Sequence, residues 1–338
     1  MSGFSQEEIS KIVRETFFPY ASRKMDKLRA NGTKFVHYTS AENAIRIIDG
    51  NCIYLRNTNL MNDFSEVQHG NNCIVGAFND EELRSRLVGV LDGVEAGLTE
   101  KILERYLAGE RVRSLDTFMI AISEHGNSDS HGNSDSNSRE DLYGRLSMWR
   151  AYGGNTNVAF VFNSTPFLAE SDALQAYTSP VLYADQETFK PLFLEVISGL
   201  EKYKAMLPRL GAENIAFYMN SALHFAALST KHPGFWEEKE WRIIFSPNFS
   251  LTGKKSDKLK SEVLTISGVP QRVFKLELNN YPEEDFLGAT LPELLEEVII
   301  GPTQYPWPIW DALVQKLTDA GVDDASKKVR VSNIPLRR

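Results

Sequence analysis

The sequence lacks the motifs that mark most familiar enzyme classes. It has only two cysteines, Cys52 and Cys73, whose positions match neither a metal site nor a disulfide framework. No glycine cluster fits a dinucleotide- or phosphate-binding fingerprint, and the H-E-x-x-H, G-x-S-x-G and C-x-x-C patterns are missing. Any functional site must therefore be inferred from groups of polar residues that match no established motif.

Long apolar runs and an excess of positive charge are missing as well. A net charge of −8 argues against general affinity for nucleic acid or anionic membranes, and leaves open only a local basic pocket. The N-terminus has no signal-peptide pattern, and no apolar run approaches the length of a membrane span. With so few cysteines, the sequence predicts a cytoplasmic protein that does not associate with membranes.

What is present is an ordinary globular composition. The 338 residues are 42% apolar and 24% charged, enough for a sizeable core. Short predicted strands separated by helices of unequal length favour an α+β fold, with a mixed, largely antiparallel sheet and surrounding helices, over a regular βαβ array. We expect a helical extension at residues 1–33 and a single domain over residues 34–338.

The periodicity of apolar residues predicts the elements along the chain. An amphipathic helix is expected over residues 5–30, begun by a capping box of Ser5 and Glu8 and broken at Pro19. Further helices are expected at residues 41–49, 63–78, 147–152 and 310–320. Residues 80–107 are expected to form one helix or a helix pair interrupted near Gly93 and Gly97. Residues 185–228 are expected to be mostly helical, with a division near Pro208 and Gly211. Strands are expected at residues 35–39, 52–55, 116–123, 158–162, 241–245, 272–278, 297–300 and 328–332.

The segment 125–138 contains the hexapeptide His-Gly-Asn-Ser-Asp-Ser twice in tandem. Nothing in it can build a core, so it is predicted to be a flexible surface insertion. Its histidines and aspartates are metal-ligating types, but a preformed metal site needs a rigid scaffold that such a loop does not offer. We therefore predict no metal site there.

Polar residues are concentrated between Phe35 and Glu66, where a strand, a helix, a second strand and a polar loop follow in quick succession. Packed cores do not need such a loop, whereas binding sites often do. The candidate ligand-binding side chains of this stretch are His37, Tyr38, Thr39, Tyr54, Arg56, Asn62, Asp63 and Glu66.

Several of these residues have structural interpretations too. Thr39 or Ser40 can cap the helix that follows, and Asn62 with Asp63 can form a turn or a cap. Glu66 comes four residues after Asn62 and shares its helical face, so this group points either into a cleft or to solvent. Oxygen ligands of this kind would suit a hard cation such as Mg²⁺.

Two aromatic residues precede a glycine pair in the middle of the chain. Trp149 and Tyr152 stand three apart, on one face of a predicted helix. They are either core aromatics or the wall of a pocket, because the glycines at 153 and 154 permit close approach of a ligand to the backbone.

Glu240 and Arg242 lie on one face of a predicted strand. They form either a surface ion pair, which would contribute little, or a pair that projects into a cleft. The neighbouring aromatic residues Phe235, Trp236 and Trp241 favour partial burial. A carboxylate beside apolar rings is a candidate for a functionally perturbed pKa.

These motifs together resemble a bacterial family of proteins of unknown function, domain-of-unknown-function family twenty-nine seventy-one. The resemblance covers Phe35 to Pro302 and rests on HYTS, IYL, the Asn62-Asp63 loop, MW-x-x-Y, W-E-x-E-W-R with one inserted residue, and I-I-G-P. The chain departs from the pattern at Arg150, where the family often has a small residue or histidine. It also reads Asn-Thr-Asn at 155–157, where the family tends to have glycine.

A weaker similarity links the chain to ADP-ribosyltransferases of the histidine-tyrosine-glutamate type. It implies that His37 and Thr39 form the first motif and that Glu240 is the catalytic glutamate. It also implies that Tyr54 or Tyr152 is the aromatic residue. In that chemistry the histidine binds a ribose hydroxyl of NAD and the aromatic ring stacks on nicotinamide. The carboxylate stabilises the oxocarbenium-like transition state.

Three hypotheses follow. The first is an NAD-consuming ADP-ribosyltransferase-like enzyme, a toxin or phage-defence effector with Glu240, His37 and Tyr152 at its centre. Its acceptor would be a nucleic acid or a protein, and a partner protein could hold it inactive. The second is a non-catalytic module that senses a nucleotide or a phage product. The third is a metal-assisted hydrolase that uses Asp63, Glu66 and Glu240, with His37 as an optional further residue.

Overall fold

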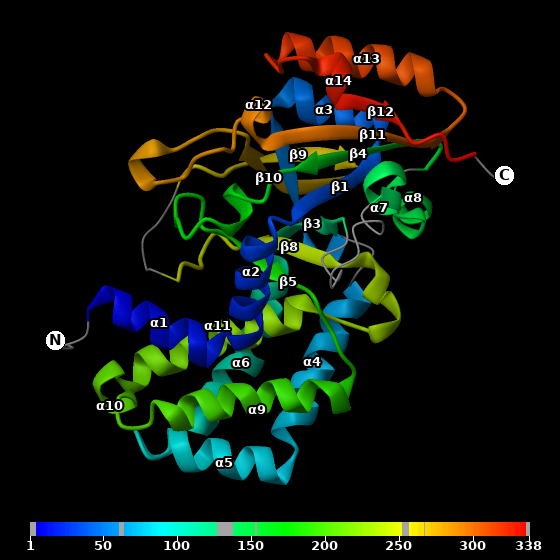
Figure 1. The fold of residues 1–338 in the computed structure, drawn as a ribbon. Helices are drawn as coiled ribbons and strands as arrows, with labels where there is room; N and C mark the ends of the chain where they lie inside the picture. The colour runs from blue at the N-terminus through cyan, green and yellow to red at the C-terminus, as the bar shows by residue number, and fades with distance from the viewer. Residues whose placement is uncertain are drawn as a thin grey trace.

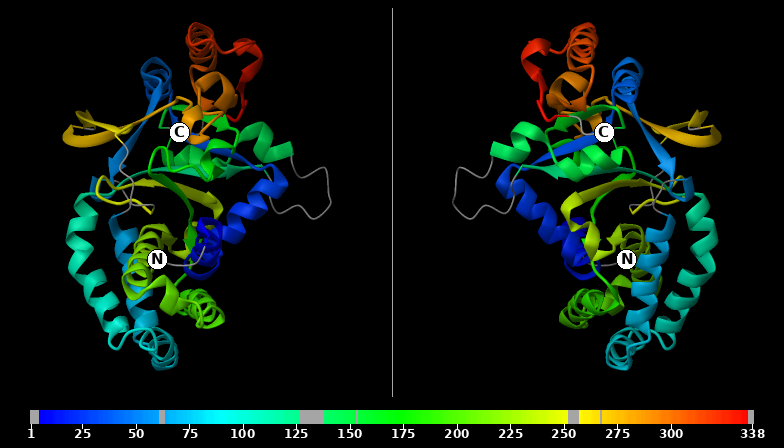
Figure 2. Two further views of the ribbon diagram at one scale, coloured as in Figure 1. Left: turned by 90° about the vertical axis from the view of Figure 1, so that its left-hand side faces the viewer. Right: turned by 90° about the vertical axis from the view of Figure 1, so that its right-hand side faces the viewer.

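The computed structural model describes residues 5–60, 64–126, 138–152, 154–251, 257–266 and 268–335. A large, mostly antiparallel sheet with helices around it confirms the predicted α+β fold. Figure 1 shows the sheet in the upper half of the molecule and a layer of long helices below it. The side views of Figure 2 show the same separation.

Within the described residues, the main sheet has ten strands, and a separate pair, β6 and β7, forms a second small sheet. The strands of the main sheet are β1 (Lys34–Ser40), β2 (Cys52–Asn57), β3 (Phe118–His125), β4 (Thr156–Phe162), β5 (Ala176–Pro180), β8 (Glu240–Phe245), β9 (Lys260–Ile266), β10 (Val269–Glu277), β11 (Leu295–Thr303) and β12 (Val329–Val331). The small parallel pair is β6 (Leu182–Tyr183) and β7 (Thr230–Lys231).

Strand β3 is the branch point of the sheet. β8 pairs with one edge of β3 over nearly its whole length, from Phe118 to Ser123. β1 pairs with the end of β3, where Lys34 lies opposite His125, and β2 pairs with its beginning, where Arg56 lies opposite Met119. Because β8 occupies one edge, β1 and β2 share the other and diverge from each other along it.

The helices form two groups. Those around the sheet are α2 (Pro19–Asn31), α3 (Ala41–Gly50), α7 (Ser138–Tyr143), α8 (Leu146–Tyr152), α12 (Leu291–Leu294), α13 (Pro306–Asp319) and α14 (Ala325–Lys328). Those of the lower layer are α1 (Gln6–Phe17), α4 (Phe64–Phe78), α5 (Glu81–Leu91), α6 (Leu98–Leu115), α9 (Gln186–Lys202), α10 (Leu207–Leu210) and α11 (Ala212–Ser229). Short 3₁₀ helices lie at η1 (Thr58–Leu60), η2 (Pro166–Leu168), η3 (Pro233–Glu238) and η4 (Pro282–Glu284).

Each group of helices encloses a core of its own. The sheet core contains the side chains on one face of the sheet, such as Phe35, Phe160 and Trp241, packed against α3 and α13. The helical core lies among α1, α4, α5, α6, α9 and α11. In the described parts of the chain, no helix is long and apolar enough to cross a membrane.

Local sequence signals placed several helix ends correctly. Ser5 and Glu8 form the expected capping box. Pro19 does not merely interrupt a helix but begins α2, a position that tolerates proline because no intrahelical N–H is needed there. Ser40 caps α3 by accepting a hydrogen bond from the Asn43 amide, and Asn51 in the left-handed region ends it, one residue after Gly50.

Of the two alternatives for residues 80–107, one helix or a helix pair, the structure has the pair, α5 and α6, separated by a turn over residues 92–97. Another element was missed. Strand β9 was not predicted. It pairs with β10 as an outer hairpin and alternates exposed and half-buried residues. Most of the tandem repeat, at residues 127–137, lies outside the described residues, and so does part of the loop before α4, at residues 61–63.

Candidate active site

The alternation of β8 divides its side chains between two environments. Trp241, Ile243 and Phe245 belong to the sheet core. Glu240 and Arg242 point from the opposite face, toward the lower helical layer, and their side chains are only 3% and 0% exposed. Of the two interpretations of this pair, the surface ion pair is therefore excluded.

Three further charged residues meet this pair. Together they form what we call the charged cluster: Glu66 of α4, Lys231 of β7, Glu238 of η3, and Glu240 and Arg242 of β8. The ammonium nitrogen of Lys231 lies at its centre. It is 2.8 Å from Glu66 Oε1, 2.7 Å from Glu238 Oε2 and 3.1 Å from Glu240 Oε2.

Arg242 provides the second cation of the cluster. Its Nε donates to Glu240 Oε1 at 2.7 Å, and its Nη2 donates to Glu66. Its Nη1 donates to the carbonyl of Leu228, at the end of α11. The cluster therefore connects the sheet to both α4 and α11 of the lower layer.

The charges of the cluster do not balance. Three carboxylates face two cations, which leaves one negative charge if every group is ionised. Burial alone would raise the pKa of Glu240, but Arg242 and Lys231 together hold it below its ordinary value. Burial raises the pKa of Glu238, which Lys231 offsets only in part. Two carboxyl groups on one ammonium thus have pKa values shifted in opposite directions.

Glu238 forms the solvent-facing edge of the cluster. Its side chain is 14% exposed, whereas that of Glu240 is 3% exposed. The same 3₁₀ helix displays two aromatic side chains, Phe235 at 47% and Trp236 at 60% exposure. The Lys231 ammonium lies 4.9 Å from the centre of the Phe235 ring. An aromatic surface therefore lies beside the carboxylates.

Two residues with hydroxyl groups, Tyr183 and Ser123, also lie beside Glu240. The backbone amide of Glu240 donates to the hydroxyl of Tyr183 at 2.7 Å. Ser123 lies directly opposite Glu240 in the register of β3 and β8 and is 1% exposed. Its hydroxyl has no hydrogen-bond partner within the described structure, which leaves it available to a water molecule or a ligand hydroxyl.

His37 and Thr39 do not join this cluster. The register pairs His37 with Phe160, whose ring is in the sheet core, so His37 and Thr39 point to the face opposite Glu240. The Nδ1 of His37 lies 3.2 Å from the carbonyl oxygen of Ala121, on the part of β3 between β1 and β2. Burial holds the pKa of His37 below its ordinary value. The first motif implied by the transferase similarity therefore lies on a different face from its glutamate.

The two aromatic residues of α8 have separate environments. Trp149 is 2% exposed and packs edge-on against Tyr38, with 4.7 Å between ring centroids. Its indole nitrogen donates to the carbonyl of Tyr143, and Tyr38 accepts from the backbone amide of Arg145. Tyr152 is 40% exposed. Trp149 is thus a core aromatic, while Tyr152 lies at the surface.

The remaining candidates of the first polar stretch lie on β2. Tyr54 donates from its hydroxyl to Glu262 at 3.3 Å, and Arg56 donates to Gln271 and to the carbonyl of Leu60. These contacts hold both side chains against the β9–β10 hairpin and η1. Asn62 and Asp63 are outside the described residues. Of this stretch, only Glu66 enters the charged cluster.

The site also contains residues that sequence reasoning missed. Nothing in the sequence marked Lys231 as a site residue, because a single lysine after an apolar helix normally remains in solvent. Glu238 was visible only as one of several charges before the strand. No group of three His, Cys, Asp or Glu residues in the described part of the chain could hold a metal ion. The three glutamates instead converge on the ammonium group of Lys231.

Comparison with known proteins agrees with part of the sequence-based resemblance. Residues 148–243 match the model of a family described as "Protein of unknown function (DUF2971)". No curated protein and no solved structure matches the chain, and nothing in these comparisons supports the similarity to ADP-ribosyltransferases. The matched segment includes four of the five cluster residues. The part of the chain from α8 to β8 thus has the sequence pattern of this family of unknown function.

Proposed function

We propose that the charged cluster is the catalytic centre of an enzyme that cleaves the N-glycosidic bond of NAD and transfers ADP-ribose to an acceptor. One observation carries the proposal. Glu238 and Glu240 share the Lys231 ammonium, yet their pKa values are shifted in opposite directions. Neighbouring carboxyl groups with divergent pKa values are typical of acid–base pairs.

The charge of the cluster suits the transition state of this reaction. As the bond between the ribose C1′ and nicotinamide breaks, positive charge develops on the sugar. In the ground state this positive charge lies on the pyridinium ring of nicotinamide, and it moves to the sugar as the bond breaks. A buried cluster with one excess carboxylate beside C1′ therefore stabilises the transition state more strongly than the ground state. Glu240 remains ionised because Lys231 and Arg242 hold it, so it contributes a fixed negative charge.

Glu238 is assigned the proton transfer. Its raised pKa and its place at the edge of the cluster suit a group that accepts the proton of the attacking acceptor. The acceptor oxygen forms the new bond to C1′, nicotinamide leaves with the electron pair of the broken bond, and the acceptor proton passes to Glu238. With water as the acceptor, the same steps give hydrolysis.

The aromatic residues of η3 provide the base-binding surface in this proposal. Phe235 and Trp236 are exposed and precede Glu238 on the same short helix. Flat aromatic side chains can stack on a nicotinamide or adenine ring. The proposal gives no role in substrate contact to His37, Thr39 or Trp149. It does not need Tyr152 either.

The test is NAD turnover by purified protein, with and without total nucleic acid or cell protein as acceptor. Glu238→Gln and Glu240→Gln are each expected to lower nicotinamide release by about 100-fold or more. Glu237→Gln is the matched control, because Glu237 is exposed and precedes Glu238 on η3. This substitution also removes one negative charge from the same helix. Turnover by Glu238→Gln at the rate of the control would refute the assignment.

A non-catalytic nucleotide-binding module is the second candidate. Both carboxylate oxygens of Glu240 already accept hydrogen bonds from Lys231 and Arg242. Glu240 therefore has a structural role that does not require catalysis, which favours this candidate. This candidate predicts that NAD or a related nucleotide binds with measurable affinity and is recovered intact from wild type. Calorimetric titration beside the turnover assay distinguishes the two candidates.

A further inference from the structure

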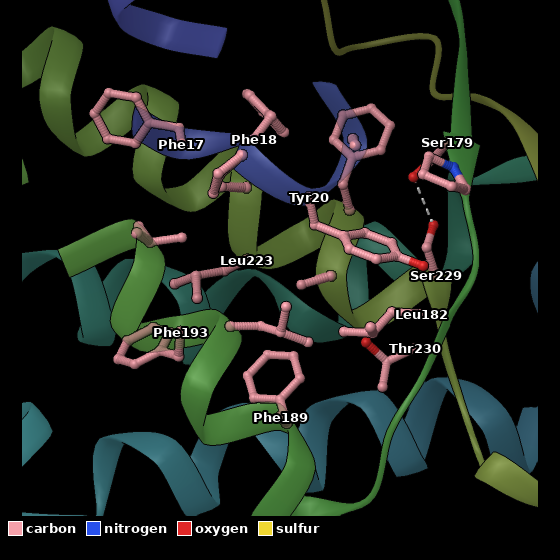
Figure 3. Close-up of a pocket in the computed structure, with 18 of the residues that line it drawn as sticks. Phe17, Phe18, Tyr20, Ser179, Leu182, Phe189, Phe193, Leu223, Ser229 and Thr230 are labelled. Carbon is pink, nitrogen blue, oxygen red and sulfur yellow. Dashed lines mark hydrogen bonds between the residues drawn. The ribbon is translucent and has the colours of Figure 1, made fainter. Parts of the chain in front are cut away.

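A cavity that differs chemically from the charged cluster lies where the lower layer meets the strands. Its walls come from the junction of α1 and α2, from α9 and α11, and from β5, β6 and β7, as Figure 3 shows. Its volume is about 110 Å³. A cavity of this order holds about one aromatic ring, because an engineered cavity of roughly 150 Å³ binds benzene.

Among the described residues that line this cavity, none has a charged side chain. Aromatic and aliphatic groups cover most of it, including Phe17, Phe189, Phe193 and Leu223. Because an ion or a phosphate buried there would lose its hydration without a compensating partner, the lining excludes nucleotides and favours an uncharged molecule. The cavity therefore accepts a different kind of ligand from the one proposed for the charged cluster.

One wall of the cavity is polar but uncharged. Ser229 donates from its hydroxyl to Ser179 at 3.0 Å, and Tyr20 donates from its hydroxyl to the carbonyl of Val181 at 3.2 Å. Thr230 is 0% exposed, and its hydroxyl has no hydrogen-bond partner among the described residues. Figure 3 shows that hydroxyl on the cavity side of the residue.

An unpaired buried hydroxyl is costly, so Thr230 calls for a partner from outside the chain. Water alone fits poorly, because a stable buried water needs two to four polar partners in a lining that is mainly apolar, and the hydroxyls of Ser229 and Tyr20 already donate to Ser179 and Val181. We infer that the cavity binds a small, uncharged, mainly apolar molecule with one hydroxyl or carbonyl group, which pairs with Thr230.

The position of Thr230 connects this site to the charged cluster. The next residue is Lys231, and Leu228, two residues before Thr230, accepts a hydrogen bond from Arg242. A ligand that holds Thr230 also restrains the backbone that positions the central ammonium. The inference about the cavity itself does not depend on the proposed function, because its lining and its unpaired hydroxyl are separate observations.

Phenol and toluene are suitable probes, since they have nearly the same shape and differ by one hydroxyl. Calorimetric titration is expected to show that wild type binds phenol. Thr230→Val keeps the shape of the side chain but removes its hydroxyl, so it should lower the ratio of phenol to toluene affinity by roughly 2- to 10-fold. Thr16→Val is the control: Thr16 is also buried with an unpaired hydroxyl, but it does not line the cavity.

Filling the cavity provides an independent test. Ala222 lines it, and Ala222→Leu should abolish the binding of both probes while the protein stays folded by circular dichroism. Failure of wild type to bind phenol, or an unchanged affinity ratio in Thr230→Val, would overturn the inference. An unchanged ratio would mean that water satisfies the hydroxyl.

Discussion

Arg242 donates from Nε to Glu240 Oε1 at 2.7 Å, across two residues of one strand, and neither side chain is more than 3% exposed. Ion pairs this deeply buried do little for stability relative to an apolar pair, but removing one partner is costly because the other charge remains without a counter-ion. Glu66 and Lys231 complete the arrangement from α4 and β7. The cluster therefore makes the contact between the sheet and the lower layer dependent on charge pairing.

Removing the buried cation should destabilise the protein strongly. Arg242→Met leaves Glu240 and Glu66 with only Lys231, and we expect the free energy of unfolding to fall by about 3–5 kcal/mol. Urea denaturation followed by circular dichroism measures this. Arg14→Met is the control: Arg14 pairs with Glu170 at 2.9 Å, but the two side chains are 46% and 67% exposed, so the expected loss is about 0–1 kcal/mol. Equal losses would contradict the role given to burial.

The contribution of Glu240 to the free energy of unfolding should depend on pH. Its pKa in the folded protein lies below the ordinary value of 4.5, so its ionised form stabilises the fold above that pH. This stabilisation is lost as the pH falls through the folded pKa. Glu240→Gln should therefore be less stable than wild type at pH 7, and the difference should shrink in acid, below pH 4.5. Urea midpoints at several pH values between neutral and acid test the sign.

Glu238 should show the opposite dependence. Its pKa in the folded protein is above the ordinary value of 4.5, so the folded state binds the proton more tightly than the unfolded state. Its ionisation costs stability as the pH rises from 4.5 through the folded pKa. Glu238→Gln should thus gain stability relative to wild type over this interval. A relative loss, measured in the same denaturation series, would show that the Lys231 contact outweighs burial.

Gly301 is needed for the close packing of Trp149. A Cβ atom at Gly301 would lie 2.7 Å from Cε3 of the Trp149 ring and 2.8 Å from Cβ of Asn157. Gly301→Ala should therefore lower the free energy of unfolding by about 1–3 kcal/mol. Gly89→Ala is the contrast, since Gly89 lies inside α5 with open space around it and should gain up to about 1 kcal/mol in helix propensity. Thermal unfolding measures both.

The two cysteines should be unreactive in the folded protein. Cys52 is 1% exposed and Cys73 is 0% exposed, and burial raises the pKa of both thiols. Titration with a thiol reagent at pH 7.5 is expected to show no rapid reaction until urea is added, when both thiols react. Fast labelling of either cysteine in the native protein would contradict the packing described for it.

The local sequence determined much of the secondary structure. The capping box of Ser5 and Glu8 and the alternation of β8 depend on contacts within a few residues, so they could be predicted. That alternation alone put Glu240 and Arg242 on one face and Trp241 on the other. The exposed hairpin of β9 was missed because an exposed strand has little of the apolar pattern by which strands are predicted.

Only the tertiary structure decided which side chains meet. The spacing of His37 and Glu240 in the sequence is compatible with one site, but the register of β1, β3 and β8 puts them on opposite faces. Lys231 reaches the centre of the cluster because β7 pairs with β6 and α4 packs beside it. The physical reason is that periodicity specifies the face on which a side chain lies, whereas the long-range packing of distant segments specifies what lies across from it.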